Sequence, residues 1–358
     1  MSGMTSLDVL TAMDRVRKQV VRTPLLTSAA FDALVGRRVW VKDETKQRTG
    51  SFKFRGALYA LSTLSKAERA AGVIAGSSGN HAQALALAAR LHKAKATVVI
   101  PGDAPAAKRE AVEALGARVI AYDRRRDRRD YLVHQIAAGS GQTIVPSSDH
   151  RAIIAGAGTV AFEMLQEAHD LAAVLVPVGG GGLLAGTALA AAHRSGLRVI
   201  GVEPVTANDT QLSLRSGRRT PIPAPDTIAD GLRHTEPARL PFEIIRHLVH
   251  DIVTVPEGLI AEAMAHLWRY YRTAAEPSGA VALAGLMQAA GRLPDGPIGV
   301  VVSGGNTDWP VYRQLLDIGM ERTERNLDAP PAALKPPDQA DRRCMIRCRS
   351  SPSTPPRT

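Results

Sequence analysis

Cysteine is almost missing from this chain of 358 residues. The only two cysteines, Cys344 and Cys348, lie close to the C-terminal end, and such a pair cannot complete a four-ligand zinc site. The long body before them has no thiol that could enter a disulfide framework. This cysteine usage predicts a protein of a reducing, cytoplasmic compartment.

Long apolar runs are missing as well, and aromatic residues make up only 4% of the chain. No apolar segment approaches the roughly 20 residues that a membrane-spanning helix requires. Residues 1–8 lack the basic and apolar regions of a secretory signal. We therefore expect neither membrane insertion nor secretion.

Acidic residues are too few to balance the basic ones, and the formal net charge is +11. The excess is concentrated in Arg124–Arg129 and in residues 342–358, which hold five arginines and no acid. Neither segment contains the interleaved aromatic residues on which single-stranded nucleic acids stack. The two segments are typical of a solvated helix face and a disordered tail, so we expect no nucleic-acid partner.

The chain does contain a regular alternation of short β-rich runs and longer alanine-rich segments. This alternation predicts parallel sheets with right-handed crossovers, and the apolar run Val174-Leu175-Val176 indicates a strand buried on both faces. Strands are expected at residues 39–42, 73–75, 96–100, 118–121, 173–178, 198–202, 252–255 and 299–302. Helices are expected at residues 81–91, 106–115, 156–167, 183–193, 258–273 and 279–290.

The segment around Lys53 carries the most information. Lys53 follows Thr49-Gly50-Ser51 at the start of a helical pattern. An amine presented in this way, in a closed and partly dry site, can form a Schiff base with a carbonyl cofactor. Alone the lysine would mean little, because most lysines are solvated surface charges.

A polar turn lies between an expected strand and an expected helix. Ser77 and Ser78 place hydroxyl and backbone N–H groups at a helix N-terminus, which attracts a carboxylate. Asn80 can donate a hydrogen bond to a phenolate-like oxygen. An ordinary helix cap would have the same sequence, so this turn indicates function only in combination with the other motifs.

A glycine-rich turn follows another buried strand. Gly179, Gly180, Gly181 and Gly182 precede a helix and allow the backbone to approach an anion closely. The rival interpretation is a dinucleotide fingerprint, since Glu203 ends the next expected strand. The site around Lys53 favours a small phosphate instead.

Ser303 ends a late strand, at the sheet edge where ligands gather in open parallel sheets. A serine that met a pyridine nitrogen would be a neutral partner and would not hold that nitrogen protonated. The ring would then be a weaker electron sink, which favours β-elimination over transamination.

These motifs together resemble the fold type II pyridoxal phosphate enzymes, specifically the serine/threonine dehydratases and serine racemases. The resemblance runs from about Arg22 to Asn306 and rests on five motifs in order. They are residues 49–56, Ser77 to His81, the four glycines, residues 276–280 and residues 303–306. It implies an α/β, tryptophan synthase β-like fold with parallel-rich sheets flanked by helices and the cofactor in an interdomain cleft. We expect a large domain of residues 1–47 and 150–320, a small domain of residues 48–149, and a disordered basic tail of residues 321–358.

The resemblance also implies roles for single residues. Lys53 would bind the cofactor covalently and move the α-proton, with Ser78 as a second catalytic residue on the opposite face. Phe52, Asn80, Gly179 to Gly182, Leu183 and Ser303 would contact the cofactor. Ser77, Ser78 and His81 would bind the substrate carboxylate. Glu203, Asp209 and the Ala207 carbonyl look like the family's loop for Mg²⁺ or Ca²⁺.

One segment departs from the pattern. Many relatives have a His-Pro pair where this chain has Pro146-Ser147-Ser148, and that segment borders the substrate in the family. The family resemblance therefore does not define which substrate side chain is accepted.

We expect an L-threonine/L-serine ammonia-lyase that eliminates water to give a 2-oxo acid and ammonia, in a homo-oligomer, either a dimer or a tetramer. The alternatives are a serine or aspartate-type racemase or a 3-hydroxyaspartate dehydratase on the same scaffold. A non-catalytic amino-acid-sensing protein is more remote, because Lys53 is present.

Overall fold

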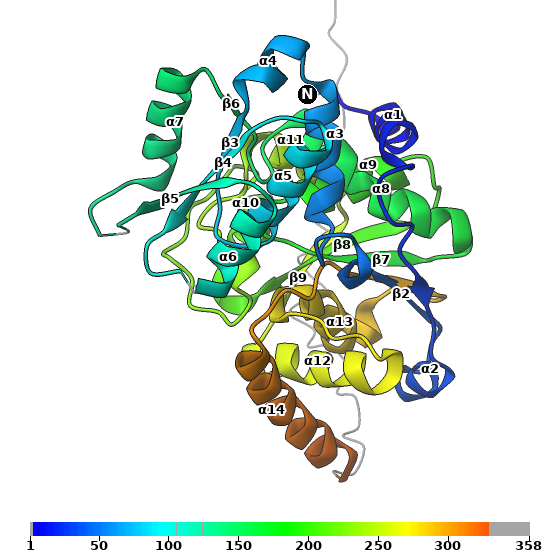
Figure 1. Ribbon diagram of the computed structural model, residues 1–358. Coiled ribbons are helices and arrows are strands. Elements are labelled where there is room, and N and C mark those ends of the chain that lie inside the picture. The colour runs from blue at the N-terminus through cyan, green and yellow to red at the C-terminus, as the bar shows by residue number, and fades with distance from the viewer. Residues whose placement is uncertain (1–2, 105, 124, 329–358) are drawn as a thin grey trace, which may run out of the picture.

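The computed structural model describes residues 3–104, 106–123 and 125–328, which form an α/β protein with two sheets (Figure 1). The larger sheet has six strands, and all its neighbours are parallel except β1 and β2. In spatial order its strands are β1 (Leu25–Leu26), β2 (Val39–Asp43), β10 (Ile298–Val302), β7 (Ala173–Pro177), β8 (Arg198–Pro204) and β9 (Asp251–Val255). The smaller, fully parallel sheet has the order β5 (Arg118–Tyr122), β4 (Ala96–Pro101), β3 (Val73–Gly76) and β6 (Thr143–Ile144).

Helices occupy most of the chain between these strands. In the first half they are α1 (Ser6–Val16), α2 (Ala29–Val35), α3 (Lys53–Thr63), α4 (Lys66–Ala71), α5 (Asn80–Leu91), α6 (Ala106–Ala114), α7 (Arg129–Ser140) and α8 (Arg151–Glu167). In the second half they are α9 (Gly182–Ala191), α10 (Asp209–Ser216), α11 (Arg239–Leu248), α12 (Glu257–Tyr271), α13 (Pro277–Ala289) and α14 (Trp309–Asp328).

Helices cover both faces of the larger sheet. Leu175 of β7 packs in a core cluster with residues of α2, α12 and α13. Its neighbours Val174 and Val176 pack in a second cluster with residues of α1, α8, α9 and α11. The expectation of a strand buried on both faces is thus confirmed, because each side chain of β7 is buried.

The smaller sheet is also covered on both faces. Val73 and Val98 pack with α3, α5 and α6, whereas Ile74 and Val99 pack with Val133 of α7. All four strands of this sheet lie within residues 48–149. The exact domain boundaries stay a prediction.

Two sequence expectations need correction. The arginine-rich segment before α7 is not a helix, because the described residues from Arg125 to Arg128 form turns and α7 begins at Arg129. The expected tail does not begin at residue 321, because α14 continues to Asp328. Thr323 is buried and donates a hydrogen bond to the Gly319 carbonyl, so this helix is still packed beyond residue 321. Residues 329–358, with both cysteines, lie outside the described residues.

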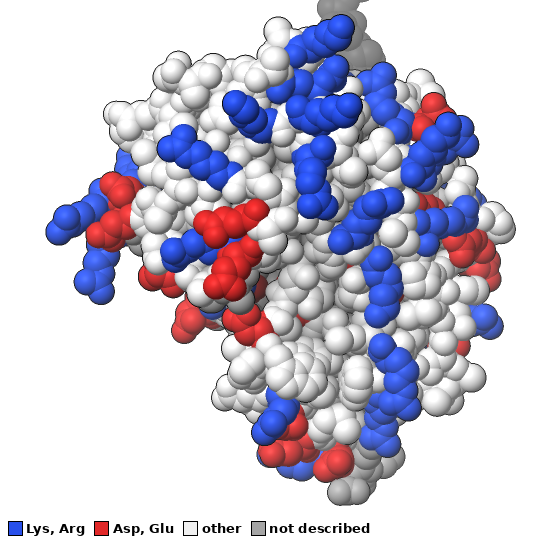
Figure 2. Space-filling model, viewed as in Figure 1, with Lys and Arg blue, Asp and Glu red and all other residues white. Residues whose placement is uncertain are grey.

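The two short strands β1 and β6 were not expected from the sequence. Each has only two residues, too few to show a period. Among the described residues, no helix has the length and apolar character needed to cross a bilayer. Lysine and arginine side chains are spread over much of the face in Figure 2, and acidic side chains form smaller groups among them.

Candidate active site

A cavity of about 510 Å³ lies where strands of both sheets end. Gly76 is the last residue of β3, Pro177 is the last residue of β7, and Ser303 follows β10; all three border the cavity. Open parallel sheets bind ligands at this edge. Every residue predicted to contact cofactor or substrate lines this cavity: Phe52, Lys53, Ser77, Ser78, Asn80, His81, Gly179, Gly180, Gly181, Gly182, Leu183 and Ser303.

Lys53 is the first residue of α3, and its amine reaches into the cavity. The Nζ atom donates a hydrogen bond to the Ser147 carbonyl at 2.9 Å. Burial lowers the pKa of Lys53 to about 8, against the opposing pull of the nearby Glu276. An amine with this pKa spends part of its time neutral near pH 7, as a nucleophile or proton acceptor must.

The serine turn lies at the start of α5. Ser77 is tied to the smaller sheet through its N–H, which donates to the Val99 carbonyl at 3.1 Å. The Ser77 hydroxyl accepts a hydrogen bond from the Gly79 N–H at 3.3 Å. The turn therefore has a defined shape at a helix N-terminus, where backbone N–H groups attract an anion.

His81 lines the cavity and also contacts the main chain. Its Nε2 lies 2.9 Å from the Val145 carbonyl, which can only accept, so this nitrogen carries the hydrogen. Burial and the neighbouring Lys53 lower the pKa of His81 to about 4, so the ring is neutral. This contact fixes the serine turn against the end of β6. Direct contact of His81 with a substrate carboxylate stays a prediction.

The four glycines wrap closely around other residues of the cavity. A Cβ on Gly179 would lie 2.9 Å from His234 Nδ1, and a Cβ on Gly180 would collide with the Ser148 hydroxyl. Gly181, at the N-cap of α9, has a φ of 84°, which favours glycine. We call the four glycines the glycine cradle; binding of a small phosphate by its backbone N–H groups stays a prediction.

A chain of hydrogen bonds fixes the orientation of Asn80. Asn306 donates from Nδ2 to the Thr49 carbonyl at 2.7 Å and to Asn80 Oδ1 at 2.8 Å. Asn80 in turn donates from Nδ2 to Glu276 at 2.7 Å. The second Nδ2 hydrogen of Asn80 remains for a ligand oxygen, as its predicted role requires.

Glu276 is buried beside this chain of hydrogen bonds. Burial, followed by the charge of Asp230, raises its pKa to about 8, whereas the hydrogen bond from Asn80 opposes the shift. The carboxyl group is therefore protonated over most of the neutral range. Its Oε1 atom would lie 2.7 Å from a Cβ on Gly304, so the group also packs against the turn that holds Ser303.

Ser303 and Phe52 are held together at the other end of the cavity. The Phe52 N–H donates to the Ser303 carbonyl at 3.0 Å, and Ser303 is buried. The Phe52 ring lies beneath the Lys53 amine, 5.0 Å from centroid to Nζ. The neutral hydroxyl of Ser303 thus lies at a strand end, as the sequence predicted.

Several cavity residues were missed or misjudged. Arg129 is exposed, as its interpretation as part of a solvated helix face implied, but it also lines the cavity, which the sequence did not indicate. His234 gave no signal in the sequence, because it comes from an irregular segment. Ser147 and Ser148, which the sequence marked only as a departure from the family, are both at the cavity wall. Glu276 lay inside a recognised motif without a role.

The predicted metal residues form a separate buried pair. Both oxygens of Asp209 are buried and have no hydrogen-bond partner in the part of the chain that the structure describes. Burial raises the pKa of Asp209 to about 7; burial, followed by the charge of Asp209, raises the pKa of Glu203 to about 8. Ala207 lies between them in a 3₁₀ turn. Two buried carboxylates suit a hard divalent cation.

No group of three or more His, Cys, Asp or Glu side chains that could hold a metal occurs within residues 3–104, 106–123 and 125–328. A cation at Glu203 and Asp209 would therefore take its other oxygens from backbone carbonyls and water. The metal role of Glu203, Ala207 and Asp209 stays a prediction.

Helix α8 packs between α3 and α9. Lys53 lies at the start of α3, and the four glycines lie at the start of α9. A Cβ on Gly156 of α8 would lie 2.7 Å from the Arg55 carbonyl in α3. A Cβ on Gly158 of α8 would lie 2.6 Å from the Gly186 carbonyl in α9. The three helices are thus in main-chain contact, and this contact fixes the separation of Lys53 from the glycine cradle.

The cavity contains the groups that pyridoxal phosphate needs. It combines an amine of lowered pKa, a glycine cradle that side chains would fill, an oriented amide donor and a neutral hydroxyl at a strand end. Lys53, Gly179 to Gly182, Asn80 and Ser303 would hold the aldehyde, phosphate, ring oxygen and ring nitrogen.

Comparisons with known proteins agree with this cavity. Residues 16–304 match the family model described as "Pyridoxal-phosphate dependent enzyme". L-threo-3-hydroxyaspartate ammonia-lyase of Saccharomyces cerevisiae is 44% identical over 310 residues, which cover 86% of this chain and 95% of that one. Serine racemase of Schizosaccharomyces pombe is 41% identical, with coverages of 86% and 96%.

A solved structure shows the same fold. Serine racemase from Dictyostelium discoideum superposes with a TM-score of 0.81 at 35% identity, and the match covers 85% of this chain and 99% of that one. The matched family model spans both sheets and includes every residue predicted to contact cofactor or substrate. The chain therefore belongs to the pyridoxal phosphate-dependent enzymes of fold type II, within the family of ammonia-lyases and racemases.

Proposed function

We propose that this chain is an ammonia-lyase whose substrate is a β-hydroxy amino acid with a second carboxylate, of the threo-3-hydroxyaspartate type. The observation that carries this proposal is the guanidinium of Arg129 at the cavity wall. Similarity to a 3-hydroxyaspartate ammonia-lyase supports it. L-threonine and L-serine, the substrates expected from the sequence, have no second carboxylate for this guanidinium to bind.

Arg129 is placed beside the serine turn. A Cβ on Gly76, the residue before Ser77, would lie 2.9 Å from Arg129 Cδ. The charge of Arg129 also contributes to the lowered pKa of His234, after burial and Lys53, so the guanidinium lies near that ring as well. It therefore stands between the predicted site for the α-carboxylate and the glycine cradle.

Other cations at the cavity are already engaged. Lys108 pairs with Asp230 at 3.1 Å, and Arg233 donates twice to the Thr227 carbonyl. Arg129 pairs with its neighbour Asp130 at 2.8 Å, but the two side chains are 46% and 78% exposed. Such an exposed pair contributes little free energy, so a substrate carboxylate can replace Asp130. A planar guanidinium suits bidentate binding of that carboxylate.

The remaining residues account for the elimination. The turn from Ser77 to Asn80 would bind the α-carboxylate, and the neutral Lys53 amine would take the proton from the α-carbon. Pyridoxal phosphate, when bound, supplies a conjugated ring that accepts the electron pair released there. The C–O bond at the β-carbon then breaks, and the Lys53 ammonium gives its proton to the departing hydroxide, forming water. Hydrolysis of the product gives a 2-oxo acid and ammonia.

A substrate panel tests the proposal. Release of 2-oxo acid should have a higher kcat/KM for L-threo-3-hydroxyaspartate than for L-threonine or L-serine. Arg129→Gln should reduce kcat/KM for the acidic substrate by about 10- to 100-fold, the effect of losing a charged hydrogen-bonded contact of about 1.5–3 kcal/mol. L-serine turnover should change less.

Arg128→Gln is the matched control. Arg128 is exposed and precedes Arg129, so both variants remove one positive charge from the same segment. If Arg128→Gln and Arg129→Gln had equal effects on the acidic substrate, general electrostatic attraction would explain the preference and the specific contact would be wrong.

Racemisation is a second candidate, because Ser78 lines the same cavity as Lys53. Two proton carriers on opposite faces of the α-carbon would allow the proton to leave one face and return to the other. Elimination should nevertheless dominate, because the neutral Ser303 favours rapid loss of the β-hydroxyl. Chiral analysis after incubation with L-serine decides this. Faster accumulation of D-serine than of pyruvate would replace the lyase by a racemase.

A further inference from the structure

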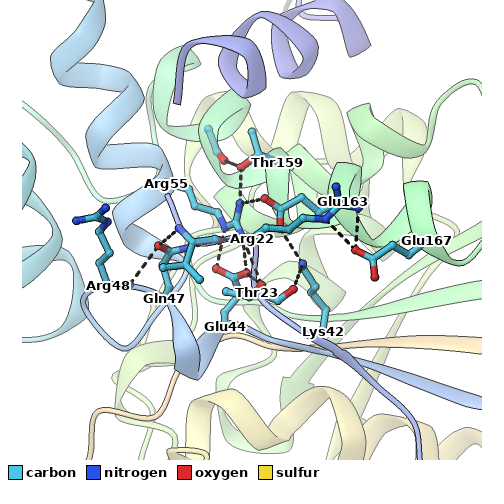
Figure 3. Close-up of polar contacts among 12 residues, drawn as sticks. Arg22, Thr23, Lys42, Glu44, Gln47, Arg48, Arg55, Thr159, Glu163 and Glu167 are labelled. Carbon is cyan, nitrogen blue, oxygen red and sulfur yellow. Dashed lines mark hydrogen bonds and ion pairs between the residues drawn. The ribbon is translucent and has the colours of Figure 1, made fainter. Parts of the chain in front are cut away.

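Beneath the cavity, on the other side of α3, lies a cluster of four fully buried charged side chains (Figure 3). Arg55 donates to both oxygens of Glu44 and to both oxygens of Glu163, each at 2.8 Å. Lys42 donates to Glu163 at 2.7 Å and to the Thr23 carbonyl at 2.6 Å. We call these four residues, Lys42, Glu44, Arg55 and Glu163, the Arg55 cluster.

The Arg55 cluster joins three parts of the fold. Lys42 lies near the end of β2, Glu44 begins the 3₁₀ turn after that strand, and Glu163 comes from α8. Two carboxylates and two cations balance each other, and the hydrogen bonds from Arg55 lower the pKa of Glu163 despite its burial. Each of the four groups thus has a partner of opposite charge.

Stability alone gives no reason for such a cluster. Removing four charges from water costs several kcal/mol per ion, and apolar replacements of buried ion pairs are often as stable. Apolar side chains do not fix the orientation of a helix in this way. A planar guanidinium that binds two carboxylates has one allowed position relative to them. The cluster therefore defines a geometry.

The element whose geometry it defines is the first turn of α3. Arg55 follows Lys53 by two residues, so at about 100° per residue the two side chains leave opposite sides of the helix. Phe52, at the N-cap, makes no side-chain cap hydrogen bond with any described residue. An N-cap side chain, which usually fixes the start of a helix, is therefore absent. The hydrogen bonds of Arg55 to Glu44 and Glu163 hold the first turn of α3 instead.

We propose that Arg55 is a positioning residue for the reaction: its paired carboxylates fix the rotation of the first turn of α3, and thereby the direction from which the Lys53 amine enters the cavity. Gly56 already fixes the distance of this turn from α8, because a Cβ there would lie 2.9 Å from the Ile153 carbonyl. Close packing sets the separation, and Arg55 with its two carboxylates, Glu44 and Glu163, sets the angle.

Two variants of the same cluster test the proposal in the holoenzyme. Arg55→Lys keeps the charge but loses the planar fork, whereas Lys42→Met removes a cation of the same cluster that is not on α3. Arg55→Lys should reduce kcat by about 10- to 100-fold with a smaller change in KM, the effect of a misplacement of about 1 Å. It should also shift the pH titration of the absorption band of the bound cofactor. Lys42→Met should lower the melting temperature but leave that titration and kcat unchanged.

Equal titrations for the wild type and Arg55→Lys would overturn the proposal, and so would equal shifts in both variants. If Arg55→Lys does not fold, Glu44→Gln loosens one of the two carboxylate contacts while keeping its shape. This variant should show a smaller shift in the same direction, and an unchanged titration would again overturn the proposal. The spectroscopic readout needs no substrate, so the result does not depend on the proposed lyase activity.

Discussion

The two sides of helix α3 hold ionisable side chains that differ in one respect. On one side, the Arg55 cluster pairs every charge, and Arg55 itself stays ionised because Glu44 and Glu163 outweigh the effect of burial. On the other side, the cavity contains Lys53 and Glu276, whose pKa values are both moved to about 8 by burial. Pairing gives rigid geometry, whereas burial without full pairing gives groups that exchange protons near neutral pH.

Paired charges therefore support the structure, whereas the partly paired groups of the cavity are suited to proton transfer. A group that must accept and return a proton cannot be locked in a strong ion pair, because its charged form would be too stable. A group that must hold a helix cannot be allowed to lose its charge. Along α3, residues of the two kinds are only two positions apart.

The experiment with the largest expected effect tests the cavity side of α3. Lys53→Ala should abolish release of 2-oxo acid and remove the yellow absorption band, because both depend on that amine. The measurements are the spectrum of the purified protein and a turnover assay. Substantial lyase activity in Lys53→Ala would show that the central assignment is wrong.

A second experiment concerns the supporting side. Glu163→Ala leaves Arg55 and Lys42 with one carboxylate between them, which should reduce the free energy of unfolding by about 3–5 kcal/mol. Chemical denaturation measures the change. Glu167→Ala is the matched control one turn further along α8, because Glu167 forms only an exposed pair with Arg22 and should contribute less than about 1 kcal/mol. Equal losses of unfolding free energy in Glu163→Ala and Glu167→Ala would show that the buried pairs contribute no more than the exposed one.

A third experiment concerns the two buried carboxyl groups of Glu203 and Asp209. A divalent cation bound from solution would supply the opposite charge that they lack. Mg²⁺ or Ca²⁺ at about 100 times its Kd should stabilise the fold by about 2.7 kcal/mol, and a chelator should reverse the effect. Asp209→Asn should abolish the response in thermal unfolding, whereas the exposed Asp295→Asn should keep it. An unaltered response in Asp209→Asn would exclude this loop as the metal site.

A fourth test concerns the pH dependence of stability. The pKa of Glu276 is raised from 4.5 to about 8, so between these values the folded state holds a proton that the unfolded state has lost. The free energy of unfolding should then fall as pH rises through this window, by up to about 1.4 kcal/mol per pH unit. Glu276→Gln should lower the slope between pH 5 and 8 by up to this amount, whereas the exposed Glu110→Gln should leave it unchanged. Part of the slope should remain, because the pKa values of Glu203 and Asp209 are also raised into this window. A slope that is the same in Glu276→Gln and in the wild type would contradict the assignment.

Local patterns were sufficient for the framework and for part of the cavity. Each expected strand overlaps an observed one, because apolar runs between turns are visible in a short window. Lys53, the serine turn and the four glycines could also be predicted, since each lies at a helix start after a recognisable turn. Placement of these motifs in one cavity follows from strand ends meeting at one sheet edge.

What could not be predicted depends on segments that meet only in the folded chain. Arg55 and Glu163 are 108 positions apart, and no local pattern marks them as partners. Arg129 belongs to a run of charged residues whose composition suggests solvent exposure, and only the orientation of α7 brings it to the cavity. His234 is a single residue in an irregular segment.

The main-chain contacts of α8 with α3 and α9 have a consequence for how this family diverges. Because Gly56, Gly156, Gly158 and Gly186 bring backbones together, the separation of the amine from the phosphate cradle does not depend on side-chain volume at the crossings. Mutations can then accumulate around the cavity mouth, at positions such as Arg129, without altering how the cofactor is held. A change of substrate and retention of the cofactor are therefore separable traits, and natural variation or directed evolution can act on the first alone.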